Sequence, residues 1–287
     1  MKEERKGELY IFGEALLWGV FPVVTVLSIA FMPAMVALGW SAFFASIFFA
    51  ILLTVRKKWG DVLNAEALPD MLWTTLIIGV LFYVLFFFGL TYTSPGNASI
   101  IALSETFFSF CLFNVLRKEY IARSHIIGAI LMLVGAGIVL YPNVHSFRTG
   151  DLLIVVASFI APFGNLFQRR ARTRVSSESI MFVRSLASVP VIFGLAYLFG
   201  ARSLVIPSGG LLLLLLVNGF FIFGLSKILW IEGIHRINIA KANALATIAP
   251  IVTLIGAYFL LADTPSLWQV LAFVPMCAGV LFLSQKA

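Results

Sequence analysis

The chain carries one pattern twice, and the order of its parts requires the second copy to lie upside down in a membrane. Gly7-Glu8-Leu9 opens one half of the sequence, and Gly150-Asp151-Leu152 opens the other. Late in each half a second match follows, in which Gly89-Leu90 corresponds to Gly233-Ile234. Each half also holds five long apolar segments, and an odd number reverses the direction in which the second half enters the bilayer. The sequence therefore predicts two inverted repeats related by an axis in the membrane plane.

The composition supports a membrane environment. Hydrophobic residues make up 61% of the chain and charged residues only 11%, with a mean hydropathy of +1.03. Soluble domains contain roughly 45–50% apolar and about 25% charged residues. The apolar runs are too long and too uniform for the alternating strands of a membrane barrel, which indicates helices.

These observations predict an all-α integral membrane protein with ten transmembrane helices in two inverted five-helix repeats. We expect the first repeat over residues 1–146 and the second over residues 147–287. The ten segments are placed at 9–29, 33–55, 72–93, 97–116, 124–141, 151–168, 179–199, 208–233, 239–261 and 267–284.

Basic residues predict the orientation. With the N-terminus inside, sixteen of the 20 Lys and Arg residues lie at cytoplasmic ends of segments, Arg148 and Arg202 lie outside, and the other two lie within segments. Positive charge collects on the cytoplasmic side of membrane proteins. We therefore expect a multi-pass protein of the cell (inner) membrane with both termini in the cytoplasm, and no nucleic-acid partner.

The two cysteines suggest no metal or redox chemistry. Cys111 and Cys277 lie in apolar segments without a Cys-x-x-Cys pattern or a neighbouring histidine. We interpret them as small buried apolar residues. Neither a Walker loop, a metal-ligand spacing nor a nucleophile triad occurs in the sequence, so we expect no cofactor and no enzymatic activity.

Several short motifs occur in a characteristic order. They are Leu17-Trp18-Gly19, Ala98 to Leu103 followed by Ser104-Glu105-Thr106, Ala244 to Pro250, and the matched pair Gly128–Gly135 and Ala272–Gly279. Together they resemble the drug/metabolite transporter superfamily, in particular its EamA-type members, over essentially the whole chain. The resemblance implies ten helices in two inverted halves, and export or exchange of small metabolites, often amino acids. Thr106 and Trp40 depart from it, since the family often has Pro and Arg at these two places.

Four charged residues fall within the apolar segments: Glu14, Glu105, Arg184 and Lys227. A charge in hydrocarbon costs at least about 2.5–3.5 kcal/mol, so each needs a partner or a wet site. Glu14 lies one helical turn before Trp18 and could bind an ammonium group, or it could simply reach water at the end of its helix. Lys227 could attract a carboxylate or phosphate, or it could form a structural ion pair with Glu14 or extend toward water.

The other two charges are predicted to gate the site or to form ion pairs. Arg184 could clamp a carboxylate with both arms of its guanidinium, although we favour a gate or a helix–helix anchor. Glu105 lies beside Ser104 and could pair with either cation.

Neutral residues complete the predicted substrate site and its hinges. Gly19 and Pro22 are expected to interrupt the first helix, and Pro162 and Gly164 the sixth, which would make both places hinges; simple packing kinks are the alternative. Asn165 adds a hydrogen-bonding group at depth. The aromatic residues Trp18, Tyr83 and Trp230 have polar neighbours and could line the site.

The sequence therefore favours a secondary active transporter, an exporter or exchanger of small polar metabolites such as amino acids, which works by alternating access. A membrane-embedded lipid-modifying enzyme and a channel are the alternatives. The expected partners are a small-molecule substrate, the lipid bilayer and, if Glu14 couples transport to a gradient, protons. Exchange and facilitated diffusion remain open, as do a monomer and a homodimer.

Overall fold

A computed structural model describes residues 3–112, 122–141, 149–201, 205–237, 242 and 245–283. Within these ranges the secondary structure is helical, with no strands. Among the described residues, seven helices are long and apolar enough to cross a membrane, and α13 (Ala249–Leu261) and α14 (Leu267–Leu283) are shorter apolar helices. The prediction of an all-α, multi-pass membrane protein is confirmed, whereas the count of ten crossings stays a prediction. Arg148, Arg202 and the beginning of the predicted ninth segment lie outside the described residues.

The remaining helices follow the predicted segments closely. Their bounds are α1 Glu3–Ile29, α2 Ala34–Arg56, α3 Leu68–Thr74, α4 Tyr83–Tyr92, α5 Pro95–Ala102, α6 Ser104–Phe110, α7 Arg123–Leu140, α8 Thr149–Ala171, α9 Ser177–Leu198, α10 Gly209–Leu216 and α11 Ser226–Ile234.

Local sequence explains where several of these helices begin and end. Pro33 precedes the first turn of α2, and Lys57 ends that helix in the left-handed conformation at φ 54°. Ser94 caps α5, because its Oγ accepts a hydrogen bond from the backbone N–H of Asn97 at 3.2 Å. Pro95 occupies the first turn of α5, where its missing N–H costs nothing.

The third segment of each half contains a π-helical stretch at a matching place. In the first half it covers Thr75–Phe82 and joins α3 to α4; in the second it covers Val217–Leu225 and joins α10 to α11. The two composite helices run over Leu68–Tyr92 and Gly209–Ile234. π-Helical turns are rare and often occur at functional sites, and here both end just before residues predicted to bind substrate.

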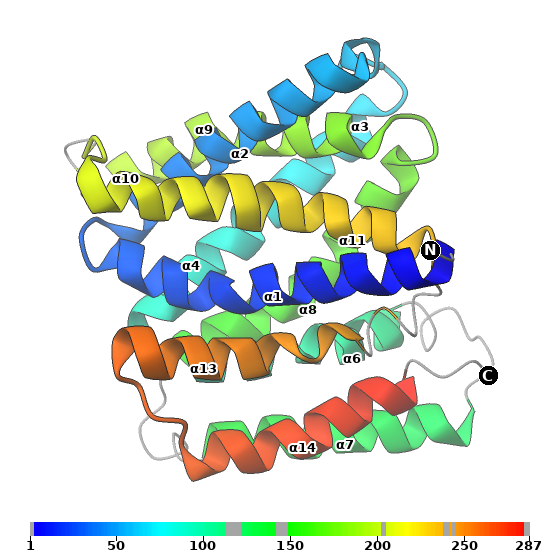
Figure 1. Cartoon of the computed structure of the whole chain (residues 1–287), viewed down its shortest axis with the longest axis vertical. Helices are drawn as coiled ribbons and strands as arrows, with labels where there is room; N and C mark the ends of the chain where they lie inside the picture. Colours follow the sequence, from blue (N-terminus) through cyan, green and yellow to red (C-terminus); the bar gives the residue numbers. More distant parts are fainter. Residues whose placement is uncertain are drawn as a thin grey trace.

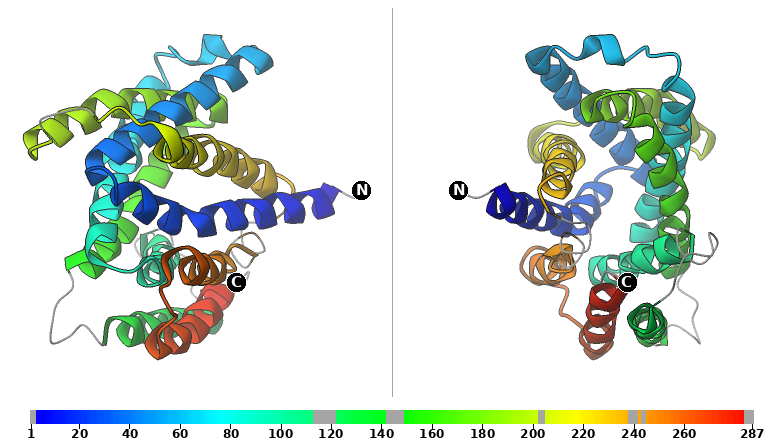
Figure 2. Two further views of the ribbon diagram at one scale, coloured as in Figure 1. Left: turned by 60° about the vertical axis from the view of Figure 1, so that its left-hand side comes forward. Right: turned by 90° about the vertical axis from the view of Figure 1, so that its right-hand side faces the viewer.

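Helices of one half pack mainly against helices of the other (Figure 1). α1 lies between α11 and α13, α8 packs against α4, and α2 crosses α9. α7 and α14 lie side by side at one edge of the molecule in every view (Figure 2). The first turns of α1 and the last turns of α14 lie at the same side of the bundle in Figure 1, which agrees with an even number of crossings.

Glycines from the matched motifs make equivalent close contacts between the halves. A Cβ added to Gly7 would lie 3.3 Å from the carbonyl oxygen of Gly233, where α1 meets α11. The corresponding Cβ on Gly150 would lie 2.5 Å from the carbonyl oxygen of Gly89, where α8 meets α4. Small residues allow such close approach of helix backbones in membranes. The sequence pattern that suggested the repeat therefore marks two equivalent helix crossings.

The expectations about the continuity of three helices were wrong. α1 continues through Pro22 and α8 continues through Pro162, because a proline removes only one backbone hydrogen bond and neighbouring helices hold the rest. The fourth segment, by contrast, was predicted to be continuous, but it divides at Leu103 into α5 and α6. A hinge at Gly19, Pro22, Pro162 or Gly164 stays a prediction.

Candidate functional site

Lys227 brings the two halves together at the centre of the candidate site. Its ammonium Nζ lies 3.5 Å from the centre of the Trp18 ring and 4.0 Å from Oε1 of Glu14. Glu14 and Trp18 share one face of α1, one turn apart, whereas Lys227 lies near the start of α11. The Glu14 side chain is only 7% exposed, so the lysine supplies both a counter-charge and a cation–π contact in a largely dry place. The interpretation of Glu14 as a group that reaches water at the helix end does not fit this burial.

Aromatic side chains form one wall around this ion pair. Trp18 stacks on Phe21 with ring centroids 4.7 Å apart, and Phe21 in turn contacts Phe223 at 5.7 Å. Phe223 contacts the ring of Tyr83 at 4.4 Å. The wall therefore combines residues of α1, α4 and the π-helical stretch before α11, and it brings the predicted Trp18 and Tyr83 into one cluster.

Glu105 reaches the site from α6 with a neutral partner. One of its carboxylate oxygens, Oε1, accepts a hydrogen bond from Nδ2 of Asn165 on α8 at 2.9 Å. Among the described residues no direct ion pair of Glu105 is found. Two residues predicted separately thus meet, although the expected cation partner is replaced by an amide.

Arg184 supplies the second positive charge. It lies on α9 and is only 4% exposed. Gly79 in the π-helical stretch of the first half makes room for it, since a Cβ there would lie 3.0 Å from Cγ of Arg184. Glu14 and Arg184 are buried and Glu105 and Lys227 are half-buried, so a set of two carboxylates of the first half and two cations of the second lies within the helix bundle.

The predicted hinge residues lie at helix contacts near this set. The Thr253 hydroxyl donates a hydrogen bond of 2.6 Å to the backbone oxygen of Gly19. A Cβ on Gly19 would lie 2.6 Å from the backbone oxygen of Ala249. Gly164 lies against Ile77 and Ile78 of the first π-helical stretch, and both Pro22 and Pro162 are buried.

Trp230 follows Lys227 by three residues on α11 and packs against a second, smaller core of Ile11, Ile237 and Ala242. Its predicted role in substrate binding stays a prediction.

Sequence reasoning missed the aromatic part of the site, and for Asn218 it predicted a hydrogen-bonding group at depth but not its partners. Phe21 and Phe223 were not distinguished among the many phenylalanines, because nothing in their local sequence separates a site-lining ring from a lipid-facing one. Asn218 lies fully buried, and its Nδ2 donates to the hydroxyl oxygens of Ser41 at 3.2 Å and Thr25 at 3.5 Å. Its position within a span was the only signal for this contact.

Comparisons with known proteins agree with this architecture. Residues 5–141 and 148–285 each match the EamA-like transporter family. An "uncharacterized transporter" of Bacillus subtilis is 25% identical over 217 residues, covering 72% of this chain and 70% of its own. A "probable amino-acid metabolite efflux pump" of Salmonella typhimurium is 23% identical over 277 residues, covering 92% and 90%.

A solved crystal structure has a similar fold, with a TM-score of 0.66 at 18% sequence identity, and the match covers 96% of this chain and 95% of the other. Together with the two family matches, which cover nearly all of the sequence, this similarity extends over both halves. The chain belongs to the EamA-like transporter family.

Proposed function

We propose that this protein is a secondary active transporter that exports or exchanges small polar metabolites by alternating access, with amino acids as the leading substrate class. The single observation that carries the proposal is the set of four charges within the helix bundle, of which Glu14 and Arg184 are buried and Glu105 and Lys227 half-buried. Buried charges inside a membrane protein are costly and usually mark a substrate or ion path. The matched halves provide the two similar packings that alternating access needs.

The charge balance of the set favours a zwitterion. Glu14 and Glu105 oppose Lys227 and Arg184, so a substrate that carries both an ammonium and a carboxylate leaves the site neutral. The Trp18 ring and Glu14, which hold the ammonium of Lys227 in this structure, would suit a substrate ammonium that takes its place, since aromatic faces attract cations. Arg184 suits a carboxylate, because its guanidinium can donate two parallel hydrogen bonds. The printed name of the Salmonella relative points to the same substrate class.

The orientation and location are part of the proposal. The distribution of Lys and Arg favours cytoplasmic termini in the inner membrane, and the side on which α1 begins and α14 ends is then the cytoplasmic side. In this orientation, efflux would load substrate between α1, α9 and α11 from that side.

Reconstitution in proteoliposomes tests the function directly. A thermal-shift screen of the purified protein against amino acids, sugars, nucleosides and cationic drugs would first select candidates. We expect a shift with one or more amino acids, followed by saturable transport of the same compounds. Uptake of a screened ligand that does not saturate, at the rates of a conducting pore, would instead favour a channel. Transport that is indifferent to an imposed pH gradient would eliminate proton coupling and leave exchange or facilitated diffusion.

The cation–π contact gives a graded prediction. Trp18→Leu removes the aromatic face next to Glu14, and we expect KM to rise by about threefold to thirtyfold, the equivalent of roughly 0.5–2 kcal/mol. Trp18→Phe keeps a weaker face and should have a smaller effect. The matched control is Trp73→Leu, since Trp73 is 51% exposed and stacks on Phe167 away from the charges. Equal KM values for Trp18→Leu and the wild type would contradict a substrate ammonium at this ring.

A further inference from the structure

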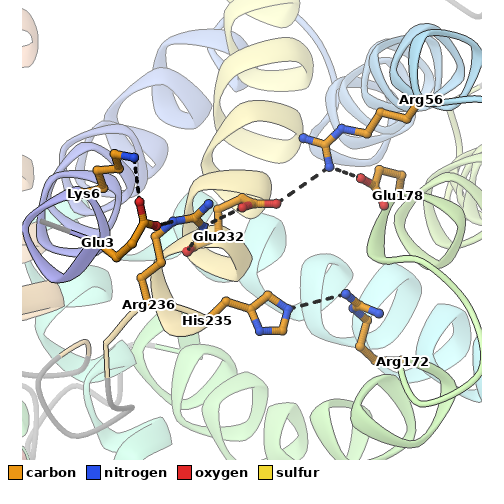
Figure 3. A network of polar contacts seen from close by, with 8 residues as sticks. All are labelled: Glu3, Lys6, Arg56, Arg172, Glu178, Glu232, His235 and Arg236. Carbon is orange, nitrogen blue, oxygen red and sulfur yellow. Dashed lines mark hydrogen bonds and ion pairs between the residues drawn. The ribbon is translucent and has the colours of Figure 1, made fainter. Parts of the chain in front are cut away.

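A chain of ion pairs joins four helices at the end of the bundle where α1 begins (Figure 3). Nε of Arg236 lies 3.2 Å from Oε2 of Glu3, and Nη1 of Arg236 lies 2.6 Å from Oε2 of Glu232. The other carboxylate oxygen of Glu232 lies 3.7 Å from Nη1 of Arg56, which also binds Glu178. The chain therefore runs from α1 through α11 to α2 and α9.

The ion pairs of Arg56 connect the two halves, as does that between Arg236 and Glu3, whereas Arg236 and Glu232 both belong to the second half. Arg56 is the last residue of α2 in the first half, whereas Glu178 and Glu232 belong to α9 and α11 in the second. The Glu178 side chain is only 7% exposed and that of Glu232 is 30% exposed. The Arg56 side chain is 40% exposed, so only its pair with Glu178 is partly shielded from the screening that makes exposed ion pairs weak.

The ion pairs lie between the four charges and this end of the bundle. Glu232 follows Lys227 on α11 by a little more than one turn, a rise of roughly 7.5 Å at 1.5 Å per residue. Glu178 precedes Arg184 on α9 by a rise of about 9 Å. A substrate that travels between the four charges and this end must therefore pass the level of Arg56, Glu178 and Glu232.

The opposite end has aromatic residues at the equivalent positions. Glu232 directly precedes Gly233, and its counterpart Phe88 directly precedes Gly89. Arg56 ends α2, and its counterpart Phe199 caps the C-terminal end of α9. The rings of Phe88 and Phe199 meet edge to face, with centroids 5.9 Å apart and planes at 74°. The same contact between the halves is thus ionic at one end and aromatic at the other.

We propose that Arg56, Glu178 and Glu232 form an ionic gate, which must separate before the site opens at the end where α1 begins. This proposal rests on the proposed transport function. The contact between Phe88 and Phe199 closes the opposite end and opens independently of charge. Because the two closures differ in chemistry, loss of the ionic one shifts the balance of states toward opening at its own end only.

Distance measurements between spin labels test the gate without relying on transport. The labels are placed at Arg5→Cys on α1 and Lys57→Cys after α2, both exposed and outside the proposed gate, in a Cys111→Ser/Cys277→Ser background. We expect Glu232→Gln to increase the population with a longer distance by about tenfold, since neighbouring charged residues commonly couple by that amount. Phe88→Leu is the matched control and should leave this distance distribution unchanged.

Arg56 variants separate a gate from a general loss of packing. Arg56→Gln leaves Glu178 buried without its cation, whereas the double variant Arg56→Gln/Glu178→Gln removes both charges. Both should show the longer distance, while Arg56→Lys should retain the shorter one. An unchanged distribution in Glu232→Gln and in the double variant would overturn the gate. Absence of transport by the wild type would instead count against the proposed function, because the distance measurement does not depend on it.

Discussion

Transport by the Glu14→Gln and Lys227→Met variants is expected to fall at least a hundredfold. Each change removes one partner of a pair whose side chains are 7% and 18% exposed. The cost of leaving a buried charge without its partner is about 3–5 kcal/mol, which corresponds to a factor of more than a hundred. Initial rates of uptake into proteoliposomes, normalised to the amount of reconstituted protein, measure the effect.

Controls distinguish a lost binding site from a misfolded protein. Glu66→Gln and Lys58→Met make the same chemical changes at exposed positions and should transport normally. The double variant Glu14→Gln/Lys227→Met carries neither charge, so it should unfold at a higher temperature than either single variant and still fail to transport. Full transport by both single variants would remove Glu14 and Lys227 from the substrate site.

Substitution of Gly150 is expected to destabilise the protein by about 1–3 kcal/mol even for alanine, as overpacking does in well-packed cores. The added Cβ would lie 2.5–2.7 Å from backbone atoms of Gly89, Tyr92 and Thr93, and backbone cannot move aside as a flexible side chain can. The melting temperature in detergent, followed by loss of the monodisperse peak on size exclusion, reports the change.

Gly137 provides the opposite expectation. A Cβ added there meets no atom within 4 Å, and alanine is preferred over glycine inside a helix by roughly 0.5–1 kcal/mol. Gly137→Ala should therefore melt at the same temperature as the wild type or slightly higher. If Gly150→Ala behaved like Gly137→Ala, the close crossing of α8 and α4 would be refuted.

The sequence predicted those residues of the site that are unusual in an apolar transmembrane segment. Glu14 and Lys227 are charges inside apolar segments, so each stood out without knowledge of its neighbour. Gly89 and Gly233 stood out because they recur at matching places in the two halves. The structure then pairs Glu14 with Lys227 and places Gly89 against Gly150 and Gly233 against Gly7.

The parts that were missed depend on partners distant in the sequence. Arg56 was interpreted only as a topological anchor, because its two acidic partners lie on α9 and α11. The wall formed by Phe21 and Phe223 was missed for a related reason, since apolar rings facing lipid and apolar rings facing a site have the same composition. The π-helical stretches also have no signature in runs of Leu, Ile, Phe and Val, because they are distinguished by backbone hydrogen bonds and not by side chains.

The number of residues in each π-helical stretch, and not only their type, decides where the side chains that follow it point. An ordinary helix turns about 100° with each residue. A π-helical turn holds more residues than an α-helical turn, so if Val217–Leu225 kept all its residues but became a regular helix, each extra residue would rotate everything after it by roughly that angle relative to α10. Lys227 would then face a different neighbour although its own sequence context was intact. Family members with a regular helix here would accordingly need either a shorter stretch or a different residue to supply the cation.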